Sequence, residues 1–511
     1  MLYFAVEMWP RQRHACSAVR SLSPLKNRSP FTHSFCAQIF CGLLIAVVTL
    51  GLSSCGVRYY KFPQYTFANR PVPPSKLDTR VLVGVTLNGA QGSLQILDAK
   101  RDIRHSIFDP NSTYSISGYA GGYPNMIFNF PEQVLGYVYS NSDGSLAQID
   151  YGKEAVGTAP AKLPSKSDSI AVPINFKHIY AASSTLGILT VVDNTNGQTY
   201  YLNLPNVYRV AVNQGDSVVL AMVRNSNTLY RLLKLNQNQP AVPGATDCQP
   251  LAVPVWCVVP VPDSASKPSL DRPVGAYFSL DGTTAYVLNC GKECGGNTSS
   301  LTMMPQGSLR VDNYPTSTPY PSPVTGSVAV PGGVTAALAD GTTLYLAGQQ
   351  LQPDGLFAGF LSTMDLNSNT ITGTYSISDG YHTKMLLGDN NTLWIGSQGC
   401  ATGERAKLQQ NYNCLTRYDI GAKSASIVPN VNPADPNSKV PYPNANENQY
   451  YYGDLTGLCW IQGKNKMYTA YGGQIHAFNT ADGSEIDNSQ ITVQGTALDV
   501  AFMDAQTNDA N

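Results

Sequence analysis

Six cysteines downstream of residue 240 stand in close pairs. The pairs are Cys248 with Cys257, Cys290 with Cys294, and Cys400 with Cys414. Cysteines at such short spacings are typical of local disulfides in proteins outside the reducing cytoplasm. The spacing of Cys290 and Cys294 also fits a zinc knuckle, although no second pair follows nearby. We expect three disulfides, which place the protein in an oxidising compartment.

Catalytic signatures are missing from the rest of the sequence. There is no His-x-His or His-Glu-x-x-His pattern, so the chain carries no zinc-hydrolase motif. There is also no haem-attachment motif, no nucleophile elbow and no nucleotide-binding loop. Cys459, inside the apolar segment 455–461, is expected to be an inert buried thiol. We therefore predict no catalytic residue, no metal and no cofactor.

The N-terminal segment of the sequence has the pattern of a targeting signal. Lys26 and Arg28 precede an apolar run over 35–52, as in a signal peptide. The segment ends in the tetrapeptide LSSC, which resembles the lipobox of bacterial lipoproteins and whose last residue is Cys55. The resemblance implies cleavage before Cys55 and its lipidation, and two acyl chains suffice for stable anchoring. A plain transmembrane anchor is the alternative, because the run is just long enough to span a bilayer.

Composition narrows the class of the protein. Of 511 residues 13% are charged, with 33 Lys and Arg against 34 Asp and Glu, while 43% are hydrophobic and 10% aromatic. A coiled coil would carry more charge, a nucleic-acid binder a basic excess, and a disordered chain fewer apolar residues. Removal of residues 1–54 leaves a mildly acidic chain, which disfavours polyanionic partners. Low charge with 30 tyrosines and 44 glycines favours an all-β protein.

A repeated segment organises the body of the chain. The sequence SLDGTTAYVL at 279–288 recurs as LADGTTLYLA at 338–347, with weaker copies at 388–396 and 462–470. In the first two copies Asp-Gly separates two apolar stretches, as in a tight β-hairpin. In several units an apolar strand ends in an aspartate that we expect to cap the following turn. These aspartates are Asp98, Asp150, Asp193, Asp365 and Asp419.

Each unit has the length of four strands, which is the size of one β-propeller blade. The innermost strands are expected to begin near Tyr123, Ser169, Asn206, Pro273, Gly333, His382, Gly453 and Thr496. This spacing predicts eight blades; seven is the alternative, because the weak unit over 206–270 can also be an insertion. Insertions over 237–270, 289–325 and 397–413 hold the cysteine pairs, with Cys414 directly after the last insertion, which places the expected disulfides on surface loops.

The two ends of the body are predicted to complete one blade together. The first unit, from Arg80, lacks an inner strand, and the last strand, 496–503, has no outer strands after it. Pairing the two closes the ring and removes exposed sheet edges. We divide the chain into a signal peptide and leader (1–54), a lipid-anchored tether (55–79), the propeller (80–504) and a disordered tail (505–511).

The repeats resemble the YVTN-type propeller family, in which Asp-Gly-Thr and Tyr-Val are followed by a strand that ends in Val-Asp. The resemblance covers 80–504 and is clearest at 273–290 and 334–348. It implies a ring of four-stranded sheets around a channel. It implies no single function, since related propellers include lactonases, haem enzymes and interaction scaffolds.

Polar residues at the entries of the innermost strands are the candidate binding residues. In propellers such positions surround one mouth of the channel, where ligands commonly bind. The candidates are Tyr123, Arg209, Arg272, Tyr381, His382, Tyr451 and Asp454. Arginine, histidine and aspartate that converge there can clamp a small anionic ligand. Ordinary solvated residues at the mouth are the alternative interpretation.

We expect a lipid-anchored binding or scaffold module of the cell envelope that is not an enzyme. Loops on a rigid ring suit a protein or glycan partner, and the body is expected to be monomeric with no nucleic-acid partner. It would face the periplasm or the cell surface, and Gly56 after the lipid site favours the outer membrane under lipoprotein sorting rules. A lactonase-like hydrolase with a metal at the channel mouth is the second hypothesis. A redox propeller with a bound quinone or haem is the third.

Overall fold

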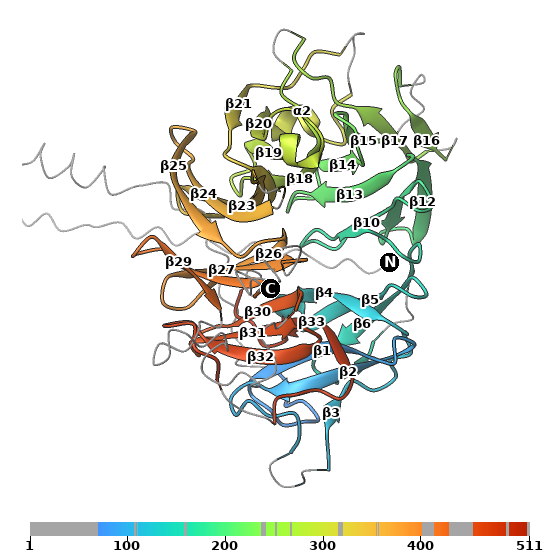
Figure 1. Cartoon of the computed structure of the whole chain (residues 1–511). Helices are drawn as coiled ribbons and strands as arrows, with labels where there is room; N and C mark the ends of the chain where they lie inside the picture. The colour runs from blue at the N-terminus through green and yellow to red at the C-terminus, as the bar shows by residue number, and fades with distance from the viewer. Residues whose placement is uncertain are drawn as a thin grey trace, which may run out of the picture. The chain divides into compact units, whose positions relative to one another are not determined.

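The protein is an all-β, eight-bladed β-propeller (Figure 1), in which eight antiparallel sheets form the ring. The computed structural model describes residues 70–106, 109, 111–157, 161–236, 242–250, 253–265, 268–314, 320–353, 355, 357–400, 413–428, 453–486 and 490–507. Cys55, Tyr451 and the predicted leader lie outside these residues. No described helix has the length and hydropathy needed to cross a bilayer.

The first four blades are numbered along the chain. Blade 1 contains β1 (Arg80–Leu87), β2 (Gln91–Asp98), β3 (Tyr114–Ser115) and β33 (Thr496–Phe502). Blade 2 contains β4 (Pro124–Phe130), β5 (Leu135–Ser140), β6 (Ser145–Asp150), β7 (Ala155–Val156) and β8 (Ala161–Lys162), with the short helix η1 (Pro131–Gln133). Blade 3 contains β9 (Ser169–Ala171), β10 (His178–Ser183), β11 (Ile188–Asp193) and β12 (Gln198–Asn203). Blade 4 contains β13 (Val207–Val212), β14 (Val219–Val223), β15 (Leu229–Leu235), β16 (Asp247–Gln249) and β17 (Val255–Pro260).

The other four blades complete the ring. Blade 5 contains β18 (Pro273–Phe278), β19 (Thr284–Asn289), β20 (Ser300–Pro305) and β21 (Gly326–Ala329), with η2 (Gly291–Cys294) and α2 (Gln306–Leu309). Blade 6 contains β22 (Gly333–Asp340), β23 (Thr343–Leu351), β24 (Phe357–Asp365) and β25 (Thr370–Ile377). Blade 7 contains β26 (Tyr381–Gly388), β27 (Thr392–Gln398), β28 (Leu415–Asp419) and β29 (Ser424–Val428). Blade 8 contains β30 (Leu455–Ile461), β31 (Lys466–Tyr471) and β32 (Gln474–Asn479).

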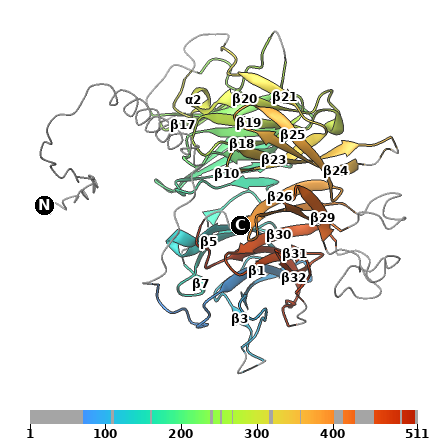
Figure 2. The same cartoon turned by 90° about the vertical axis from the view of Figure 1, so that its left-hand side faces the viewer.

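The blade count and the start of each innermost strand confirm the sequence prediction. The unit over 206–270 is a blade of five strands and not an insertion. The ring closes because the last strand, β33, pairs antiparallel with β1, with Leu82 opposite Ala501 and Val83 opposite Val500. Figure 2 shows the strands of blades 7, 8 and 1 as successive neighbouring sheets.

The core consists of apolar layers between neighbouring blades. Because side chains alternate along a strand, one face of each sheet packs on the blade before it and the other on the blade after it. In β1, Val81 and Val83 pack in the cluster shared with blade 8, whereas Leu82 packs in the cluster shared with blade 2. Each of the eight junctions between blades has such a cluster. Buried apolar area between the sheets therefore holds the ring together.

The predicted turn aspartates cap their turns. Asp193, for example, accepts a hydrogen bond from the backbone N–H of Thr195 at 2.9 Å, and Asp419 accepts one from Ala422 at 2.8 Å. Asp98, Asp150 and Asp365 do the same for the turns that follow them. Such local bonds give the backbone N–H groups of the turns a hydrogen-bond partner outside the sheet ladder.

An ion-pair network fastens the closing blade. Arg80 at the start of β1 is only 3% exposed, and its guanidinium contacts Asp504 at 2.7 Å and Glu154 at 2.9 Å. Asp504 follows the closing strand, and Glu154 belongs to blade 2. Ser75, within the predicted tether, also donates to Glu154, so residues from 70 onward contact the propeller. One buried arginine thus joins β1 and the segment after β33 to blade 2.

All three expected disulfides are present. The pair Cys248–Cys257 links residues directly opposite each other on β16 and β17, and Cys257 is fully buried. The expectation that this pair lies on a surface loop is therefore wrong, because the segment 247–260 forms outer strands of blade 4. The pairs Cys290–Cys294 and Cys400–Cys414 close the turns that follow β19 and β27.

Candidate functional site

The innermost strands surround a central cavity of about 860 Å³. In seven blades the innermost strand carries one extra residue opposite its neighbouring strand, a β-bulge. Six of these extra residues line the cavity: Asn125, Tyr208, Val274, Thr383, Thr456 and Leu498. The bulges therefore decide which side chains reach the centre of the ring.

Four of the candidate residues from the sequence line this cavity. They are Tyr123, Arg209, Arg272 and Tyr381. Arg209 on β13 donates a hydrogen bond from Nη2 to the Tyr381 hydroxyl on β26 at 2.9 Å. Because blades 5 and 6 lie between these two strands along the ring, the bond spans the cavity. It fixes the guanidinium in the cavity.

His382 does not reach the cavity, contrary to the sequence-based prediction. Its side chain is fully buried, and the ring contacts the carbonyl of Ser378 from Nε2 at 2.8 Å. Since a carbonyl only accepts, Nε2 carries the proton, and Nδ1 has no partner. Burial lowers the pKa of His382 to about 4, so the ring is neutral at pH 7. Because of the bulge at Thr383, Thr383 and Lys384 line the cavity whereas His382 does not.

Asp454 is also absent from the described lining of the cavity. Its carboxylate accepts the backbone N–H of Gly399 at 2.7 Å and thereby holds the turn after β27. Tyr451 lies outside the described residues, so the structure places only six of the seven candidates.

Three arginines form one side of the cavity, from blades 4 and 5. This arginine wall consists of Arg209, Arg224 and Arg272. Arg224 pairs with Asp168 at 2.9 Å, and its guanidinium lies 4.6 Å from the centre of the Tyr208 ring, as in a cation–π contact. Neither Arg209 nor Arg272 forms an ion pair with a described carboxylate. The wall is therefore locally basic although the whole chain is nearly neutral.

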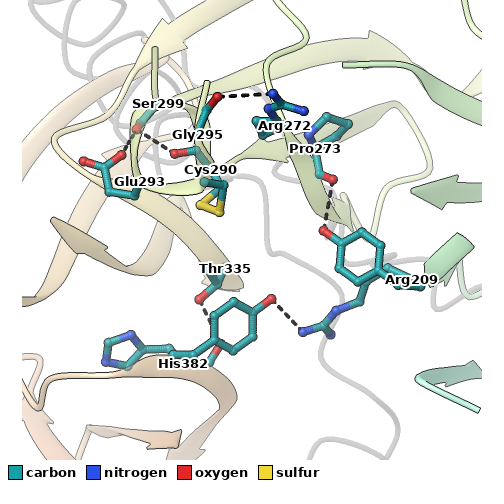
Figure 3. The surroundings of a disulfide bond; sticks show 12 residues. Arg209, Arg272, Pro273, Cys290, Glu293, Gly295, Ser299, Thr335 and His382 are labelled. Carbon is teal, nitrogen blue, oxygen red and sulfur yellow. Dashed lines mark hydrogen bonds between the residues drawn. A yellow bond between two sulfur atoms is a disulfide. The ribbon is translucent and has the colours of Figure 1, made fainter. Parts of the chain in front are cut away.

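Arg272 is positioned by the disulfide turn of blade 5 (Figure 3). Its Nη2 donates to the carbonyl of Gly295 at 3.2 Å, directly after η2 and the Cys290–Cys294 disulfide. Asp271 next to it accepts the backbone N–H groups of Asn297 and Thr298 at 2.6 and 2.7 Å. The turn over 290–298 is thereby folded back on the entry of β18.

An ion pair between the partly exposed Lys384 and the buried Asp499 occupies another side of the cavity. Lys384 on β26 contacts the carboxylate of Asp499 on β33 at 3.3 Å, and Asp499 also accepts the backbone N–H of Ile127 at 2.9 Å. Burial raises the pKa of Asp499, while Lys384 opposes this shift. Gly457 packs against Asp499, and a Cβ there would lie 2.7 Å from its Oδ1, so only glycine leaves room for the carboxylate.

Several buried polar atoms of the lining have no hydrogen-bond partner among the described residues. They are Oδ1 of Asn125, Oδ1 of Asn141, Oγ1 of Thr383 and Nε of Arg272. Buried polar groups in folded proteins nearly always find a partner, in the protein or in ordered water, and a ligand can take the place of that water. These atoms and the rings of Tyr123, Phe128, Tyr208 and Tyr381 share the same cavity. The lining is thus suited to a polar molecule with apolar faces.

Sequence reasoning missed Arg224, Lys384 and Asp499. The position of Asp499 inside the apolar segment 496–502 could have indicated a functional role, because charged residues are rarely buried without a partner. Lys384 stands two positions beyond the predicted entry of its strand, and the bulge brings it to the cavity. Arg224 follows the second strand of its blade. It was missed because the candidates were taken only from the entries of the innermost strands.

Among the described residues, no three His, Cys, Asp or Glu side chains form a group that could hold a metal ion. Cys459 is buried, and burial raises the pKa of its thiol, in keeping with an inert residue. No protein-family model matches the sequence, and no curated protein is similar enough to match it.

Solved structures with a similar fold have low sequence identity. A dihydro-heme d1 dehydrogenase, NirN, in complex with DHE has 13% identity and a TM-score of 0.48, covering 87% of this chain and 82% of its own. Hydrazine synthase from Kuenenia stuttgartiensis has 12% identity and a TM-score of 0.45, covering 70% and 96%. The β-propeller domain of Cps50 (Swd1) from Myceliophteria thermophila has 10% identity and a TM-score of 0.44, covering 70% and 98%. These similarities concern the fold and carry no statement about activity.

Proposed function

We propose that this propeller is a binding module of the cell envelope that takes a glycan in its central cavity. The observation that carries the proposal is the set of unpartnered buried polar atoms beside aromatic rings in one cavity. A sugar offers hydroxyl groups to atoms such as Asn125 Oδ1 and Thr383 Oγ1, and a ring face of C–H groups to the tyrosines. A cavity of about 860 Å³ is within the usual range of ligand sites, roughly 300–1,000 Å³.

A proposed extracytoplasmic location rests on the disulfides and on the signal sequence. Three disulfides are typical of oxidising compartments. Lipidation of Cys55 would anchor the module to a membrane and is tested by the variant Cys55→Ser. We expect the variant to leave the membrane fraction of the producing cell, and mass spectrometry of the wild type to show an acylated N-terminal cysteine. An unmodified, uncleaved wild type would contradict the anchor.

Glycan binding is tested by calorimetry with defined oligosaccharides and the variant Thr383→Val. This change keeps the side-chain shape but removes the hydroxyl, which costs about 1 kcal/mol of binding free energy if the ligand bonds to it. We expect about a fivefold weaker affinity. Thr374→Val on the exposed face of β25 is the matched control and should leave affinity unchanged. Equal affinity in both variants would remove the cavity as the binding site.

A lactonase-like hydrolase remains the alternative, and no observation favours it over binding. That activity needs carboxylates and histidines around a divalent metal at the channel mouth. Elemental analysis of the purified protein discriminates the two functions, because a stoichiometric divalent ion would favour the hydrolase.

A further inference from the structure

The geometry points to an acidic saccharide as the ligand, with its anionic group against the arginine wall and its hydroxyl groups against the rest of the cavity lining. This inference rests on the proposed function, because it names the class of ligand for the same site. It follows from an uneven distribution of charge around the cavity.

The arginine wall carries more positive charge than its neighbours neutralise. Of its three guanidinium groups, only that of Arg224 forms an ion pair with a described carboxylate, that of Asp168. Arg209 and Arg272 each donate one hydrogen bond from Nη2, to the Tyr381 hydroxyl and to the Gly295 carbonyl. No other described group bonds to these two guanidinium groups, and Nε of Arg272 is buried without a partner among the described residues. A guanidinium binds carboxylate, sulfate or phosphate through two parallel hydrogen bonds.

Both arginines are held in place before a ligand arrives. Tyr381 fixes Arg209 from the far side of the ring, and the disulfide turn of blade 5 fixes Arg272 (Figure 3). Groups that are fixed in this way lose little conformational freedom on binding, which favours affinity. Two arginines held in this way form a fixed anion site, unlike arginines that move freely on a surface.

The rest of the lining is polar but nearly neutral. The charge of Lys384 is balanced by Asp499, which lies opposite it at 3.3 Å. Asn125 and Asn141 contribute amide groups, and Tyr123 and Phe128 contribute rings. Such a surface is suited to hydroxyl groups and to the apolar face of a sugar ring. A small inorganic anion would leave this part of the cavity without contacts.

The test compares two probes, a galacturonate disaccharide and its methyl diester, which differ in charge and in two ester methyl groups. Both have the same hydroxyl groups and rings, but the ester has no negative charge. Isothermal titration of the purified protein should give about tenfold or tighter binding of the acid, since charge-assisted hydrogen bonds are stronger than neutral ones. The affinity for the acid should fall with added salt, while that for the ester should not.

Variants of the wall give the second readout. Arg272→Gln and Arg209→Gln should reduce the affinity for the acid about tenfold and leave that for the ester unchanged. Arg310→Gln, which removes an exposed arginine paired with Asp312, is the matched control and should change neither. Thermal unfolding of each variant shows whether it is folded, and Arg209→Lys, which keeps a charge, serves if Arg209→Gln does not fold.

The possible outcomes separate this inference from the proposed function. Equal binding of acid and ester would overturn the acidic class and leave glycan binding in place. Binding of the ester alone would do the same. Absence of binding by both probes at millimolar concentration would overturn the inference together with the proposed function. If both glutamine variants still prefer the acid, the anionic group does not bind at the arginine wall.

Discussion

Arg209 of blade 4 and Tyr381 of blade 7 form a hydrogen bond of 2.9 Å across the central cavity. The two residues are 172 positions apart in the sequence and belong to sheets that share no ladder. Their bond links opposite parts of the ring and orients a guanidinium that has no ionic partner among the described residues. Loss of the Tyr381 hydroxyl alone would remove this bond.

Replacement of Tyr381 by Phe should weaken binding of an acidic saccharide without reducing stability. The change removes only the hydroxyl, so Arg209 gains rotational freedom that must be lost again on binding. We expect an affinity about fivefold lower by calorimetry, with an unchanged thermal midpoint. Tyr201→Phe, on the exposed face of β12, is the control. An unchanged affinity in Tyr381→Phe would mean that Arg209 needs no support.

Removal of the Cys290–Cys294 disulfide should lower affinity more than removal of Cys248–Cys257, although it should cost less stability. The loop between Cys290 and Cys294 is short, so its chain-entropy contribution is about 2 kcal/mol, against about 3 kcal/mol for the wider loop. Only the first disulfide holds the turn that contacts Arg272. Double serine variants of each pair, compared by denaturant unfolding and ligand titration, test this opposite order.

A result in which both disulfide variants lose stability and affinity in parallel would argue against a specific role for the turn of blade 5. Such a result would mean that affinity follows global stability alone.

Replacement of Arg80 by Ala should strongly destabilise the ring. The variant leaves Glu154 and Asp504 without their buried partner, and breaking a buried ion pair costs about 3–5 kcal/mol. Urea unfolding should show this loss, and limited proteolysis should release the C-terminal strand first. Arg310→Ala is the exposed control, which we expect to change stability by less than about 0.5 kcal/mol. Comparable stability of the two variants would contradict a role for Arg80 in closure.

His382 should make the protein less stable in acid. Its pKa in the folded state is about 4, below its ordinary value of 6.5, so the unfolded chain binds the proton first as the pH falls. Stability is therefore lost between pH 6.5 and 4, by about 3 kcal/mol at the lower end. In His382→Gln this part of the acid sensitivity should disappear, whereas His105→Gln, at a half-buried site outside the core, should keep it. Parallel pH profiles of His382→Gln and the wild type would show that another group is responsible.

The sequence by itself determined the blade repeat, the closure and the local staples. Asp-Gly turns such as Asp281-Gly282 and strand-end aspartates such as Asp193 act through neighbouring residues, so their effect is visible in a short window. The predicted starts of the innermost strands lie within two residues of those observed, as at Ser169, Pro273 and Gly333. The disulfides were predictable for the same reason, since the partners are 4 to 14 residues apart.

Only the tertiary structure decided which side chains face the cavity. Side chains alternate along a strand, so one extra residue in a bulge reverses the face of everything that follows, and the hydrophobic pattern does not reveal it. For this reason His382 is buried while Thr383 and Lys384 line the cavity. The partners Arg209–Tyr381 and Lys384–Asp499 come from different blades, and their contact depends on the curvature of the whole ring.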